Sequence, residues 1–163
     1  MRNFARTTAL WVLVAFVGET MIGPAIAIYG VRPDFAVIAL VILALSAGTA
    51  PATAGGFILG LVQDLSNPTL LGLQALSKTG LGFGLGRLRS RLVYGVPVVE
   101  AGVVFFSVLA HDVFFLLVQS NLTDESFFWP LLTQTLPGAL YSGLAGVPLL
   151  RLAELLGILR QED

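Results

Sequence analysis

The stretch from Arg32 to Asp64 constrains the fold more than any other part of the chain. It reads RPDFAVIALVILALSAGTAPATAGGFILGLVQD, so two apolar runs flank a break of small residues at positions 46–54. An Arg-Pro-Asp opens the first run and a single Asp closes the second. This pattern predicts a helical hairpin that crosses a membrane and returns, with Arg32, Asp34 and Asp64 at the same surface.

The rest of the chain is as apolar as this hairpin. Of its 163 residues, 56% are hydrophobic and only 12% are charged, whereas a soluble domain carries about 25% charged residues. Runs such as VIALVIL and VVFFSVLA are apolar on every side, unlike the alternating strands of a membrane barrel. We therefore expect an all-α integral membrane protein.

Turns and charged residues divide the chain into six predicted transmembrane helices within a single domain, residues 1–163. Their expected ranges are about 7–28, 34–47, 53–64, 70–88, 96–119 and 128–156. The second and third would be only about 18–21 Å long, short of a hydrocarbon core of about 30 Å. Either they extend through positions 46–54, or the bilayer is locally thin, or neighbouring helices shield the hairpin.

The positions of the arginines give an independent test of the six-helix count. They form three groups: Arg2 and Arg6; Arg87, Arg89 and Arg91; and Arg151 and Arg160. An even number of predicted helices separates each group from the next, so all three groups would lie on one side. The positive-inside rule makes that side the cytoplasm, which predicts a multi-pass protein with both termini cytoplasmic.

Several charged residues fall inside the predicted helices, where each would cost at least ~2.5–3.5 kcal/mol if exposed to lipid. Helix direction and the rise per residue place most of them in the outer half of the membrane. This polar cluster comprises Glu19, Lys78 and Asp112 with Arg32, Asp34 and Asp64 at the hairpin ends. Lys78 is the only cation predicted to lie within the membrane, because the arginines lie at the helix ends or in loops, so three acids would compete for it. Glu100 is predicted near the inner face instead, within reach of the basic loop. The cluster is either an outward-facing site for a partner or ligand, or an internal network that fixes helix packing.

Nothing in the sequence indicates a catalytic or metal site. His111 precedes Asp112, but neighbours in a helix point about 100° apart, so we do not expect them to act as a pair. The chain has no second histidine and no cysteine, which argues against a metal or thiol centre. No nucleophile elbow or phosphate-binding loop is present, so we expect neither an enzyme nor a cofactor.

Glycines four residues apart occur in two of the predicted helices. Gly56-xxx-Gly60 lies in the third, and Gly80-xxx-Gly84 and Gly82-xxx-Gly86 lie in the fourth. Small residues at this spacing let helices approach closely. We expect Gly56, Gly60, Gly80 and Gly84 to pack these two helices together, or alternatively to receive a partner's helix.

The order of these motifs resembles the MreD family. The similarity includes Arg32-Pro33-Asp34, then Gly56-Phe57-xx-Gly60-Leu61-xx-Asp64, Leu71-Gly72-Leu73-x-Ala75-Leu76 and Gly86-Arg87-Leu88-Arg89. It covers residues 32–91 closely, and the remaining helices are similar only in length, number and polarity. Lys78, His111 and Asp112 are not part of this pattern.

The resemblance implies a rod shape-determining protein of the bacterial inner membrane, a scaffold that helps to direct peptidoglycan synthesis during cell elongation. It implies direct binding of MreC, and association through that complex with RodA, PBP2 and MreB. Membrane lipids are the other expected partners, and no nucleic acid is expected. The sequence does not decide whether the chain forms a homodimer. The implied fold is similar to the substrate-binding subunit of energy-coupling-factor transporters. A vitamin-binding transporter subunit is therefore the alternative function, and a lipid flippase or polyprenol-linked enzyme is a third.

Overall fold

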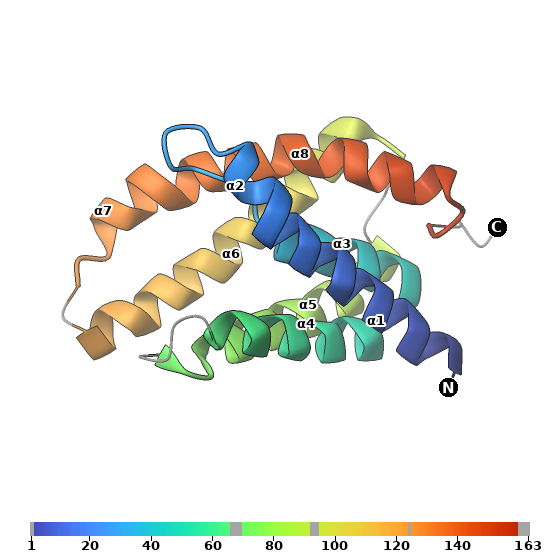
Figure 1. Ribbon diagram of the computed structural model, residues 1–163, viewed down its shortest axis with the longest axis horizontal. Coiled ribbons are helices and arrows are strands. Elements are labelled where there is room, and N and C mark those ends of the chain that lie inside the picture. The colour runs from blue at the N-terminus through green and yellow to red at the C-terminus, as the bar shows by residue number, and fades with distance from the viewer. Residues whose placement is uncertain (1, 66–69, 92–94, 124, 160–163) are drawn as a thin grey trace.

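The structure is a computed structural model that describes residues 2–65, 70–91, 95–123 and 125–159. It is 85% helix. Its described residues contain no strand, apart from an isolated bridge between Ile28 and Val31. The prediction of an all-α protein is confirmed. Figure 1 shows the helices running along the long axis of the molecule or obliquely to it.

The helical elements follow the predicted order with shifted bounds. They are α1 (Arg2–Val17), η1 (Gly18–Ile22), α2 (Gly23–Ala25), α3 (Phe35–Ala47), α4 (Thr49–Asp64), α5 (Leu73–Leu88), η3 (Arg89–Arg91), α6 (Pro97–Thr123), α7 (Phe128–Pro130), η4 (Leu131–Thr135) and α8 (Leu136–Leu155). The first helical run therefore begins before residue 7 and ends at Ala25, three residues before the expected end.

Helix α3 is the centre of the molecule. Every residue from Phe35 to Leu45 is buried, because α1, α4, α5, α6 and α8 all pack around it. A helix that is apolar all round is stable only when it is enclosed in this way. Of the three explanations for the short hairpin, the structure supports two: the helices extend through positions 46–54 except at Gly48, and neighbouring helices shield α3.

The break between α3 and α4 is much shorter than the nine small residues suggested. It consists of Gly48 alone, whose φ of +87° is a conformation that glycine adopts without strain. Helix α4 begins at Thr49 rather than near residue 53. Pro51 falls in its first turn, where the amide groups have no partner within the helix and a missing N–H costs nothing.

Helices α4 and α5 pack backbone against backbone through four glycines. A Cβ on Gly56 would overlap the carbonyl group of Lys78, and one on Gly60 would overlap the backbone of Ala75. Gly82 and Gly86 of α5 meet the backbone of α4 in the same way. The expected packing role of Gly80 and Gly84 is wrong, because nothing lies within 4 Å of a Cβ built on either of them. They instead line an apolar groove of about 840 Å³ between α5 and α6.

Two helical segments widen to π-helices, and both precede a proline. The sequences are Thr20-Met-Ile-Gly-Pro24 at η1 and Thr133-Gln-Thr-Leu-Pro137 at η4. A proline ring crowds the carbonyl of the residue four positions earlier. Because proline has no backbone N–H, it also cannot donate a hydrogen bond to that carbonyl. Each Thr hydroxyl donates to a carbonyl one turn further back, at 2.7 Å in both cases. The repeated T-x-x-x-P sequence accounts for both π segments.

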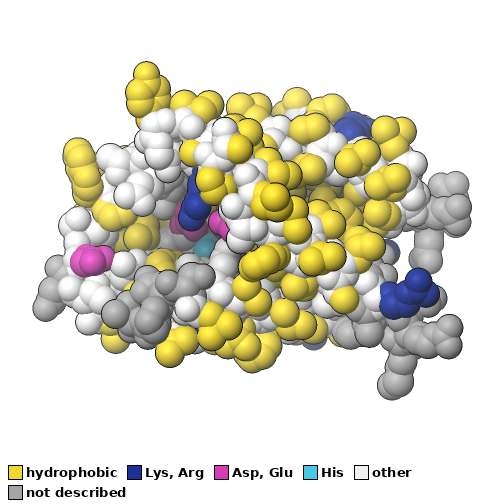
Figure 2. All heavy atoms as spheres, in the orientation of Figure 1, with side chains coloured by type: hydrophobic (Ala, Val, Ile, Leu, Met, Phe, Trp, Pro, Cys, Tyr) yellow, Lys and Arg dark blue, Asp and Glu magenta, His cyan; other side chains and the backbone are white. Residues whose placement is uncertain are grey.

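Much of the surface is apolar. Figure 2 shows a face covered mostly by hydrophobic side chains, and large apolar residues such as Met21, Leu144 and Leu155 are exposed. Two helices, Thr8–Ala25 and Pro97–Thr123, are long and apolar enough to cross a membrane, and α3 is a shorter apolar helix.

Three helix ends that carry basic residues lie at one end of the molecule. Figure 1 shows the start of α1, the end of α5 and the end of α8 at that end. The Arg89 guanidinium approaches Gly48, at the junction of α3 and α4. Arg151 forms an ion pair with Glu100 at 3.4 Å and donates to the carbonyl of Gly95 at 2.7 Å. Glu100 is thus at the basic end, as its depth suggested, but among the described residues its ionic partner is Arg151 rather than the basic loop.

Candidate functional site

A polar cavity of about 450 Å³ lies near the other end, where α3 begins and α6 ends. Figure 2 shows it as a hollow in which acidic, basic and histidine side chains gather within an apolar surface. Its polar lining consists of Glu19, Arg32, Asp34, Gln74, His111, Asp112, Gln119, Glu125, Gln134, Thr135 and Ser142. Both π segments contribute to this lining, with Glu19 on η1 and Gln134 on η4.

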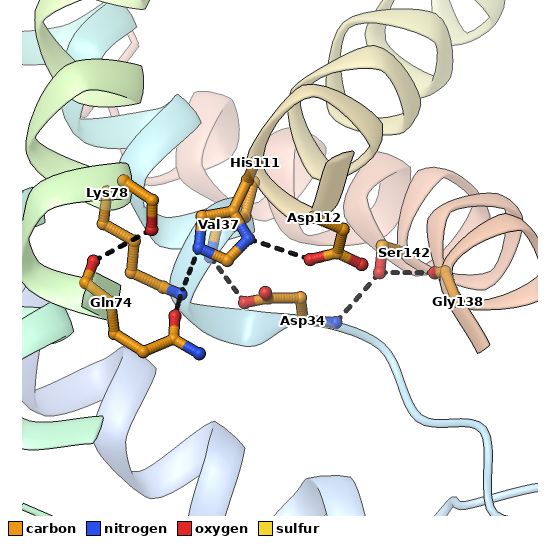
Figure 3. A network of polar contacts seen from close by, with 9 residues as sticks. Asp34, Val37, Gln74, Lys78, His111, Asp112, Gly138 and Ser142 are labelled. Carbon is orange, nitrogen blue, oxygen red and sulfur yellow. Dashed lines mark hydrogen bonds and ion pairs between the residues drawn. The ribbon is translucent and has the colours of Figure 1, made fainter. Parts of the chain in front are cut away.

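A buried chain of hydrogen bonds runs along one wall of the cavity. The Lys78 ammonium lies 2.8 Å from the Gln74 Oε1 atom and 2.9 Å from the His111 Nε2 atom. The His111 Nδ1 atom lies 2.8 Å from the Asp112 Oδ1 atom (Figure 3). Because an ammonium group can only donate, Nε2 is the acceptor and Nδ1 carries the proton shared with Asp112.

This geometry corrects two expectations. Lys78 makes no ion pair within 4.0 Å with any acid of the described chain, and reaches Asp112 only through the imidazole. His111 and Asp112 do meet, although they are neighbours in α6, because the short carboxylate reaches the near ring nitrogen. The ring is also stacked on Phe115, with 6.3 Å between centroids, so its orientation is fixed.

Asp34 ties the start of α3 to α8. Its Oδ1 atom accepts a hydrogen bond from the Val37 amide at 2.8 Å, which caps the helix. Its own amide donates to the Ser142 hydroxyl at 2.9 Å, and that hydroxyl donates to the Gly138 carbonyl at 2.7 Å (Figure 3). The second carboxylate oxygen of Asp34 accepts no hydrogen bond from a described residue.

Asp64 is not at the cavity. It is 1% exposed, and its two oxygens accept hydrogen bonds from the amides of Gln74 and Ala75, each at 3.0 Å. These amides lie in the first turn of α5 and have no acceptor within the helix. The carboxylate therefore caps α5, and its negative charge interacts favourably with the positive end of the helix dipole. Of the residues predicted to form one polar surface, Asp64 is therefore structural and cannot meet a partner.

The remaining predicted residues lie around the cavity mouth. Glu19 is half-buried in η1, and its Oε2 atom is buried with no hydrogen-bond partner among the described residues. Arg32 is exposed at the rim. The structure thus brings together Glu19, Arg32, Asp34 and Asp112, with Lys78 behind the wall.

Three of these side chains are close enough to resemble a metal site. Each of these residues offers one ligand atom, and the three atoms lie within 4.8 Å of one another: Asp34, His111 and Asp112. However, both ring nitrogens of His111 already have partners, and one of these partners is the cationic Lys78. A metal on either nitrogen would break this chain and lie beside an ammonium group, so the donor set does not fit a metal ion.

Sequence reasoning missed Gln74, Thr135 and Ser142 as members of this site. Gln74 precedes Lys78 by four residues, which places both on one face of α5 and gave a usable signal. The T-x-x-x-P repeat gave a signal for Thr135, because it marks the two widened segments that frame the cavity.

Comparison with protein families gives a match over residues 2–156 to the family described as rod shape-determining protein MreD. The match includes every described helix of the chain. Comparison with curated proteins gives no match. Comparison with solved structures also gives none.

Proposed function

Because the chain belongs to the MreD family, we propose that it is a non-enzymatic membrane scaffold that binds MreC and helps to direct peptidoglycan synthesis. The observation that carries this proposal is the family match over residues 2–156. The family is a membrane protein family with a structural role in rod shape and is not a known enzyme family. RodA, PBP2 and MreB would associate through MreC.

The proposed topology has six spans and cytoplasmic termini in the bacterial inner membrane. Its support is the position of Arg89 and Arg151 toward one end of the bundle, with the end of α6 and α7 at the other. The short helix α3 fits this topology because other helices enclose it and separate it from lipid. The polar cavity would then open toward the outer surface.

Single cysteines test the topology cleanly because the chain contains no cysteine of its own. Tyr29→Cys lies at the proposed outer end and Ser90→Cys at the proposed inner end, and both positions are exposed. A membrane-impermeant maleimide should label Tyr29→Cys on intact spheroplasts and Ser90→Cys only after permeabilisation. Labelling of Ser90→Cys on intact cells would refute the topology.

Binding of MreC is tested by co-purification from solubilised membranes of a rod-shaped host. The tagged chain should retain MreC, and an unrelated six-span protein with the same tag should not. Depletion of the chain should round the cells, and re-expression should restore rods. Absence of MreC from the purified chain, with rod shape kept on depletion, would contradict the scaffold role.

One observation supports the alternative of a small-molecule-binding transporter subunit. The cavity of about 450 Å³ is within the usual range for ligand pockets, about 300–1,000 Å³. Native mass spectrometry of the gently purified chain separates the two functions. A bound vitamin-sized molecule would favour the transporter subunit, and retained MreC without one would favour the scaffold.

A further inference from the structure

The polar cavity carries an excess of negative charge. The charged residues of its lining are Glu19, Asp34, Asp112, Glu125 and Arg32. With Lys78 behind the His111 ring, four carboxylates face two cations, which leaves a formal charge of −2. Carboxylates that are partly removed from water either pair with a cation or take up a proton. The described residues supply too few cations to compensate all four carboxylates in their ionised form.

Oxygen atoms around the cavity also lack hydrogen-bond donors. The Glu19 Oε2 atom is buried without a partner. Asp34 and Asp112 each use Oδ1 within the protein and leave Oδ2 without a donor from any described residue. Thr135, which is only 4% exposed, lines the same cavity, and its hydroxyl bonds to no other described residue. These acceptors come from four different elements and converge on one space.

We propose that this cavity receives the guanidinium or ammonium group of a basic side chain from the membrane-proximal segment of MreC, an inference that rests on the proposed function. An arginine offers five donors in a rigid fork, which suits several carboxylate oxygens around one space. The opposite charges of cavity and guest provide complementarity. Lys78 and His111 hold Asp112 in place, while the capping bond to Val37 holds Asp34, so the receptor is formed before the guest arrives.

Neutral variants of nearly the same shape test this proposal. Glu19→Gln and Asp112→Asn remove charge, and the asparagine can still accept from the His111 Nδ1 atom. Each change should weaken MreC retention by about 10-fold or more, the usual effect of breaking a buried charge pair. Without MreC, Glu19→Gln should unfold at or above the wild-type temperature because a neighbouring like charge is removed, and Asp112→Asn should stay folded because its hydrogen bond to His111 is kept. Glu154→Gln, an exposed carboxylate at the opposite end, is the matched control.

A photo-crosslinking residue in place of Gln119 in the cavity lining provides a second readout, with the same residue in place of the exposed Phe83 as control. The cavity position should crosslink to an MreC peptide that contains Lys or Arg. If the wild-type chain retains MreC while the neutral variants retain it equally, only the present inference fails. If the wild-type chain retains no MreC, the proposed function fails with it. A crosslink to lipid alone would also overturn the inference.

Discussion

Adding one methyl group at Gly56 should destabilise the protein, whereas the same change at Gly80 should not. A Cβ on Gly56 would lie 2.7 Å from the Lys78 carbonyl carbon, 0.7 Å inside the 3.4 Å at which ordinary contact begins. Both contacting groups are helix backbone, so neither can rotate away and α4 must move from α5. Overpacking of this kind costs about 1–3 kcal/mol.

Gly80→Ala is the matched control, because nothing lies within 4 Å of its added Cβ. There the substitution should gain about 0.5–1 kcal/mol, since alanine loses less conformational freedom than glycine in a helix. At about 2–4 °C per kcal/mol for a chain of this size, Gly56→Ala should lower the melting temperature by about 2–12 °C and Gly80→Ala should raise it slightly.

Thermal unfolding in detergent micelles, followed by tryptophan fluorescence, measures both changes. Trp11 is 8% exposed and reports loss of the core, whereas Trp129 is 71% exposed. A Gly56→Ala protein as stable as the wild type, or a Gly80→Ala protein that melts earlier, would refute the assignment of the contact face of α5.

Three further substitutions test the polar contacts, each by the same melting assay. Asp64→Ala should cost about 1–3 kcal/mol because two amides of α5, one of them buried, lose their acceptor, and Asp64→Asn should cost less. Ser142→Ala should cost about 1–2 kcal/mol and should speed hydrogen exchange at the start of α3, because the Asp34 amide loses its partner. Lys78→Met should cost about 1–3 kcal/mol because the Gln74 Oε1 and His111 Nε2 atoms lose their donor, and Asp112→Asn in the same chain should recover the part that comes from uncompensated charge. If the Lys78→Met/Asp112→Asn double variant is no more stable than the Lys78→Met single variant, the expected coupling between the two groups is absent.

The helical hairpin could be predicted from the sequence because its cues are local. The apolar run of α3, the small residues around Gly48 and the charged ends all follow from hydropathy and backbone freedom. The contact face of α5 could not be predicted in this way. Gly80-xxx-Gly84 and Gly82-xxx-Gly86 have the same spacing, and only the rotation of α5 against α4 distinguishes them.

The location of the polar site was also partly predictable. Counting residues along each helix placed Glu19, Lys78 and Asp112 at similar depth, and the structure brings Glu19 and Asp112 to one cavity with Lys78 behind its wall. The pairing of Lys78 was not predictable, because it depends on which side chain occupies the space between α5 and α6. His111 occupies it and separates the ammonium from the carboxylate.

The enclosure of α3 has a consequence for how the chain is made. Its thirteen residues rise only about 20 Å, so it is too short to anchor itself as an independent span. In the proposed topology it would enter the bilayer together with α4 and stay only partly enclosed until α6 and α8 have been synthesised. Truncation of the chain before α8 should therefore leave α3 incompletely covered.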